Sequence, residues 1–92
     1  MKLTIIPIDG AVGKDGKFYN GLDLSLCDIP VDVHALQWQD TTGWIEYTSA
    51  LVQNQDITEL PAWANACVVK WQEFYETEQA AILAAQQTQQ KG

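Results

Sequence analysis

The sequence predicts an α+β fold, with a small antiparallel β-sheet in the first half of the chain and one long helix in the second. Short segments rich in β-branched and aromatic residues, separated by Asp-Gly and Asn-Gly turn signals, occupy residues 2–48. From residue 62 to residue 87 there is no glycine or proline, and apolar residues recur at three- and four-residue steps. Strands that all precede a helix, rather than alternate with helices, are typical of this class.

The first strand is predicted over residues 2–8, KLTIIPI, where Pro7 places it at an end or an edge of the sheet. Three turn signals follow, at Asp9-Gly10, Asp15-Gly16 and Asn20-Gly21. Because glycine adopts positive φ without a steric penalty, the middle signal is expected to join strands near 11–14 and 17–19. The GxxxxGK[ST] and GxGxxG spacings of phosphate-binding loops do not occur here, so turns are the preferred interpretation.

Residues 21–32, GLDLSLCDIPVD, alternate between apolar and polar side chains, which predicts either a half-buried strand or an extended loop that ends at Pro30. Two further strands are predicted over 33–39 and 44–48, because both segments are rich in residues that suit a pleated surface. The polar residues between them form a loop, with Gly43 expected in the left-handed conformation. The predicted sheet is therefore a meander of three to five short strands.

This last hairpin contains the single histidine of the chain. Counting by twos places His34 on one face with Leu36 and Trp38, and Glu46 on a face with Trp44. An acid–base pair of His34 and Glu46 would need a nucleophile or a substrate pocket, and the sequence shows neither. A histidine with a satisfied ring nitrogen, at the edge of the core or on the surface, is the preferred interpretation. We therefore predict that the protein is not an enzyme.

Residues 56–61, DITELP, have the composition of a helix start, with capping side chains, acids near the positive end and a proline suited to the first turn. The helix is expected to continue to about Gln87 and to pack its aromatic part, residues 63–75, across the sheet. Residues 1–78 are thus expected to form one compact domain. Residues 79–92 are rich in alanine and glutamine, and they either fray or pair with another copy or chain through an alanine-lined seam.

Composition excludes several classes of function. Twelve carboxylates and five lysines give a net charge of −7, and the chain contains no arginine. Such a chain would repel a nucleic-acid backbone and lacks the bidentate donor that reads phosphates and base edges. The acidic residues are scattered along the sequence, which does not favour mimicry of DNA. The surface is instead expected to be a solvated acidic one.

No cofactor and no metal are predicted. Cys27 and Cys67 do not form a CxxC pair, and with one histidine they leave too few ligands for a closed zinc site. The start of the chain does not have the pattern of a secretory signal, and no run is long enough to span a membrane. The two cysteines are therefore expected to be reduced, buried thiols.

The aromatic residues are the candidates for binding another protein. Tryptophan and tyrosine are enriched at binding hot spots, because each combines a large contact area with a polar tip. The candidate protein-binding residues are Trp44, Tyr47 and Trp63. Trp38 and Trp71 are expected to fill the core instead.

Several strings of the sequence, taken together, resemble a family of small proteins encoded in tailed phages and prophages beside tail-fibre genes. These strings are IPIDG, NGLDL, VHALQW, GWIEY and ITELPAWANACVVKW. The resemblance covers about Ile5 to Trp71 and leaves the alanine- and glutamine-rich tail outside. It implies a tail protein or tail-fibre assembly protein that acts through protein contacts, with a phage tail or tail-fibre protein as its partner. It brings no catalytic residues.

The resemblance further implies a location in the cytoplasm of the host bacterium during assembly, and in the virion tail if the protein stays in the particle. A second copy of the chain is the other candidate partner, in a homo-oligomer formed through the C-terminal helix. The alternative function is a prophage-encoded accessory module that binds a host protein. Its acidic surface would then select a basic partner.

Overall fold

The computed structural model describes residues 1–91 of the chain, with side chains described for residues 1–87. Its elements in chain order are β1 (Lys2–Ile6), the 3₁₀ helix η1 (Pro7–Asp9), β2 (Ala11–Lys14), β3 (Lys17–Tyr19), β4 (Val33–Gln39), β5 (Thr42–Tyr47), β6 (Gln55–Ile57) and α1 (Ala62–Lys91). One antiparallel sheet is followed by one long helix, which confirms the predicted α+β fold.

The sheet has six strands in the order β3-β2-β1-β4-β5-β6. It consists of two three-stranded meanders that join where β1 pairs with β4. The sixth strand exceeds the predicted range because β6 lies where a loop and a helix start were expected. Its polar residues Gln55 and Asp56 pair with Ile45 and Trp44 of β5 through the backbone, so no apolar alternation reveals the strand.

The predicted hairpin at Asp15-Gly16 is confirmed, since Lys14 pairs with Lys17 and both turn residues have positive φ, 51° and 89°. The prediction for Gly43 is wrong. The left-handed residue of the β4–β5 turn is Asp40, with φ of 59°, and Gly43 lies within β5 opposite Trp38. Glycine is needed there for space instead of conformation, because an added Cβ would lie 2.2 Å from the carbonyl oxygen of Gln37.

A β-bulge in β4 overturns the predicted faces of the first part of this strand. Val33 pairs with Tyr47 and Ala35 with Glu46, which leaves His34 as the extra residue. His34 is therefore exposed, while Val33 is buried with Leu36 and Trp38. Simple alternation had predicted that His34 shares a face with Leu36 and Trp38, and this prediction is wrong.

Residues 20–32 form a loop with no strand, so the extended-loop interpretation of this segment is correct. A turn in which the Cys27 N–H donates to the Leu24 carbonyl at 3.0 Å brings both of these side chains into the core. Leu26, between them, is left in solvent.

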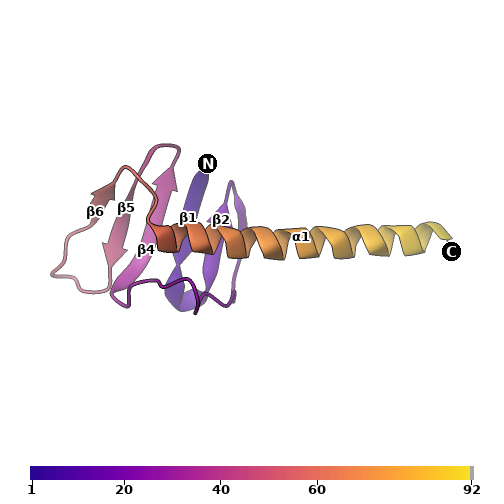
Figure 1. The fold of residues 1–92 in the computed structure, drawn as a ribbon, viewed down its shortest axis with the longest axis horizontal. Coiled ribbons are helices and arrows are strands. Elements are labelled where there is room, and N and C mark those ends of the chain that lie inside the picture. The colour runs from indigo at the N-terminus through magenta and orange to yellow at the C-terminus, as the bar shows by residue number, and fades with distance from the viewer. Residues whose placement is uncertain (92) are drawn as a thin grey trace.

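Helix α1 begins at Ala62, one residue after the proline, and the Pro61 carbonyl accepts hydrogen bonds from the N–H groups of Ala64 and Asn65. The acids expected to cap the helix lie before it, because Asp56 is part of β6. Figure 1 shows α1 crossing the sheet, where it buries Ala64, Cys67 and Trp71 against the inner face. The predicted core positions of Trp38 and Trp71 are confirmed.

The helix continues past the sheet edge formed by β3, as the yellow end of the ribbon in Figure 1 shows, and gives the molecule extents of 60 × 25 × 19 Å. Glu78 attaches the helix to the sheet through an ion pair with Lys17 at 3.3 Å and a hydrogen bond from the Tyr19 hydroxyl at 3.1 Å. We call residues 79–91 the helix extension. All its described side chains, residues 79–87, are exposed.

Candidate functional site

The three aromatic candidates do not form one patch. Trp44 lies on the face of the sheet opposite α1, where its side chain is 42% exposed and its Nε1 donates to Glu46 at 2.9 Å. Tyr47 and Trp63 lie on the other face, beside the start of α1, and both are half-buried. A partner that covered Trp44 would therefore not contact the other two.

Tyr47 and Trp63 line the same hollow, of about 450 Å³, between the β5–β6 edge and the start of the helix. The Tyr47 hydroxyl donates to the Gln55 side chain at 2.6 Å, which ties β5 to the strand beside it. The remaining lining includes the carboxylates of Asp32 and Glu59, and no lysine. The hollow is thus aromatic and aliphatic with acidic side chains nearby, and no cationic side chain lines it.

The open face of the sheet has a second exposed aromatic residue that the sequence analysis did not single out. Phe18 of β3 is 51% exposed and lies over Gly13, and strand register places it in one row with Thr4, Gln37 and Trp44. Between the two aromatic rings the Thr4 hydroxyl donates to the Gln37 side chain at 2.7 Å. The sequence around Phe18 does not reveal this placement, because it depends on the pairing of five strands, β3, β2, β1, β4 and β5.

The largest group of exposed apolar side chains on one element belongs to α1. Val69, Phe74, Ile82 and Leu83 are all exposed, and the last two lie in the helix extension. The buried stripe of Cys67 and Trp71 continues along the helix into Ile82, where no sheet lies beneath it. In the sequence, the helix extension was indicated by the change to an alanine- and glutamine-rich composition after Glu78.

The described part of the chain contains neither a hydrogen-bonded pair of His34 and Glu46 nor a group of three possible metal ligands. His34 and Glu46 form no hydrogen bond or ion pair with each other among the described residues, and Glu46 instead accepts from Trp44. No three His, Cys, Asp or Glu side chains converge within the described residues as metal ligands would. Across the same residues, no helix is sufficiently long and apolar to cross a membrane.

The two cysteines, from the loop and from the helix, are neighbours in the core and are both free thiols. Burial, together with the charge and hydrogen bond of the adjacent Cys27 thiol, raises the pKa of Cys67 to about 12. A thiol with so high a pKa is almost entirely protonated at neutral pH and is a poor nucleophile. Cys67 is buried in the core, where it packs as a protonated thiol at neutral pH.

This pKa makes a prediction for alkaline stability. The unfolded chain ionises Cys67 near the ordinary value of 9.0, whereas the fold holds the proton to about 12. The free energy of unfolding should therefore be unaffected by this group below pH 9 and should fall as pH rises from 9 toward 12. Urea denaturation followed by circular dichroism at several alkaline pH values measures the fall.

Cys67→Ala supplies the comparison, because it removes the thiol and keeps every other titrating group. Burial and the Glu78 hydrogen bond also raise the pKa of Tyr19, and this contribution remains in both proteins. The alkaline fall should be shallower in Cys67→Ala. Equal slopes in the two proteins would show that Cys67 ionises as freely in the fold as in the unfolded chain.

No protein-family model, curated protein or solved structure matches this chain.

Proposed function

We propose that this chain is a non-catalytic protein of tailed phages or prophages that acts in tail or tail-fibre assembly by binding other protein chains. The resemblance of its sequence strings to such proteins supports the phage assignment. The helix extension supports action through protein contacts. The partners are a phage tail or tail-fibre protein and, through the helix extension, a second copy of this chain.

The helix extension is the observation on which the proposal depends. Because residues 79–91 extend a helix that is already formed over the sheet, they need no new nucleus, and alanine and glutamine favour the helical state. The extension nevertheless leaves the apolar side chains of Ile82 and Leu83 in solvent. The domain core is already closed by Trp71 and the residues around it, so burial of these side chains requires another chain.

Charge favours a second copy as the chain that covers the helix extension. Two chains of net charge −7 repel each other, but residues 79–90 contain no charged side chain. The helix extension is about 20 Å long, at 1.5 Å per residue. Since this exceeds the Debye length of about 8 Å at physiological salt, two copies can pair through it while their acidic domains stay screened from each other.

Fractionation of cells that produce the encoding phage or induced prophage tests the assignment. A virion component is expected in purified particles, detected by mass spectrometry. An assembly protein is expected to copurify with the tail-fibre protein before assembly and to be absent from particles. Recovery with a host protein, and with neither particles nor tail-fibre protein, would contradict the proposal and would favour the accessory host-binding module.

A further inference from the structure

One end of the sheet carries most of the fully exposed aliphatic side chains of the molecule. Helix η1, the loop of residues 20–32 and the loop of residues 48–54 all connect strands at this end, as Figure 1 shows below the sheet. We call these three connections the loop end. Four aliphatic side chains there are between 82% and 101% exposed, namely Ile8, Leu26, Val31 and Leu51.

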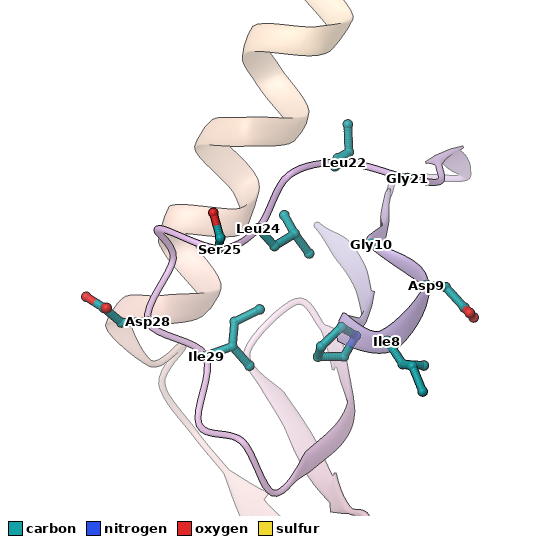
Figure 2. A pocket seen from close by; sticks show the side chains of 10 residues that line it. Ile8, Asp9, Gly10, Gly21, Leu22, Leu24, Ser25, Asp28 and Ile29 are labelled. Atoms are coloured by element: carbon teal, nitrogen blue, oxygen red, sulfur yellow. The ribbon is translucent and has the colours of Figure 1, made fainter.

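A hollow of about 620 Å³ lies in the loop end, between η1 and residues 21–29. Figure 2 shows Leu24 and Ile29 pointing into the hollow, while the carboxylates of Asp9 and Asp28 point away from it on opposite sides. Two aliphatic side chains thus enter the hollow, and two carboxylates lie outside it on either side. Such a site suits an apolar side chain surrounded by cationic groups.

Backbone hydrogen bonds hold these connections together. The N–H of Gly21 donates to the Asp9 carbonyl and that of Leu22 to the Gly10 carbonyl, each at 3.0 Å, which joins the two walls of the hollow. The third connection is attached to the second, because the Thr48 N–H donates to the Asp32 carbonyl at 2.9 Å. The loop end is therefore pre-organised, which reduces the entropy that binding would otherwise cost.

Charge at the loop end is of one sign. Its three connections contain four aspartates and no lysine, whereas Lys2, Lys14 and Lys17 belong to the opposite end of the sheet. Two hydrogen bonds from Ser25 lower the pKa of Asp23, and the charge of the nearby Lys70 of α1 makes a smaller contribution in the same direction. The carboxylates of Asp9, Asp28 and Asp32 have no ion-pair partner among the described residues.

We propose that the loop end docks a partner protein that inserts an aliphatic side chain into the hollow and surrounds it with lysine or arginine. Exposed aliphatic groups collected on one surface mark contact sites, and unpaired carboxylates around them select a basic partner and speed its approach. A second copy of this chain would present the same acidic loop end and would be repelled. This inference shares with the proposed function only the premise that the chain acts through protein contacts, and it uses a surface separate from the helix extension.

A synthetic amphipathic peptide of leucine and lysine serves as the probe of this chemistry, with a leucine–glutamate peptide of equal length as its control. Amide shifts of the full ¹⁵N-labelled chain are followed by nuclear magnetic resonance during titration. The leucine–lysine peptide should shift the amide resonances of residues 7–10, 21–32 and 48–54, and its binding should weaken with added salt. Shifts centred on the helix extension, no shifts at all, or equal binding of the glutamate peptide would overturn the inference.

A triple variant at the loop end and a control variant on α1 distinguish specific docking from a general effect of exposed apolar side chains. Ile8→Ser/Leu26→Ser/Leu51→Ser changes side chains that already lie in solvent, so folding should be unchanged and peptide affinity should fall about tenfold or more. Val69→Ser removes an exposed aliphatic group from α1, outside both the loop end and the helix extension, and should change the affinity by less than about twofold. Equal effects of the two variants would overturn the inference, and would leave the proposed role of the helix extension untouched.

Discussion

Trp71→Ala is expected to lower the free energy of unfolding by about 4 kcal/mol, the usual cost of emptying a buried tryptophan site. The indole is 6% exposed, and its Nε1 donates to the Lys17 carbonyl at 2.9 Å. Its ring stacks on Tyr75 with centroids 5.0 Å apart, and Lys14 Nζ lies 4.9 Å from the ring centroid. Urea denaturation followed by far-ultraviolet circular dichroism measures the loss.

A loss of this size is a large fraction of the stability of a 92-residue domain. Trp71→Phe is the matched control, because it keeps an aromatic ring but removes the hydrogen bond to β3. It should cost about 1 to 2 kcal/mol. If Trp71→Ala were as stable as Trp71→Phe, the attachment of α1 to the sheet would not depend on this side chain.

Gly43→Ala should destabilise the fold by about 3 kcal/mol through overpacking, although it adds a single methyl group. The new Cβ would lie 2.2 Å from the carbonyl oxygen of Gln37 and 2.9 Å from the Cα of Trp38. Both neighbours are backbone atoms of β4, the strand that pairs with β1 and β5. Relief of the clash must therefore move the centre of the sheet, and thermal or urea unfolding will record it.

Gly13→Ala is the control for this prediction, because the three atoms nearest to its added Cβ all belong to the ring of Phe18. That ring is half exposed and can rotate toward solvent without moving a strand. Its cost should be about 1 kcal/mol. A smaller loss for Gly43→Ala than for Gly13→Ala would show that β4 and β5 separate more easily than their register implies.

The fold class and the first hairpin could be predicted because their causes are local. Asp15-Gly16 specifies a tight turn by its own backbone preferences, and the glycine- and proline-free second half specifies a helix. Strand β6 could not be predicted, since Gln55 and Asp56 are placed by backbone pairing with β5 and not by an apolar pattern. The bulge at His34 was equally hidden, because it depends on how β4 matches Tyr47 and Glu46 across the hairpin.

The candidate binding residues show the same limit. Composition identified Trp44, Tyr47 and Trp63 as aromatic candidates, and alternation along the strand already separates Trp44 from Tyr47. Only the packing of α1 on the sheet shows that Trp63 lies beside Tyr47 in one hollow. The sequence did not reveal the loop end, because Ile8, Leu26 and Leu51 lie far apart in the chain. Each lies in a segment whose local sequence is typical of a turn, a loop or a strand. The helix extension was visible, since a change of composition along one element needs no tertiary information.

The helix extension gives the most direct test of the central claim, that residues 79–91 serve contact with another copy and not the stability of their own domain. Sedimentation equilibrium of the full chain, over a range of concentrations, is compared with that of a chain that ends at Glu78. The full chain should show a mass that rises with concentration, and the shortened chain should stay a monomer. At concentrations where both chains are monomers, their unfolding temperatures should be equal. A constant monomer mass for both chains, or a marked loss of thermal stability of the shortened chain under those monomeric conditions, would contradict the claim.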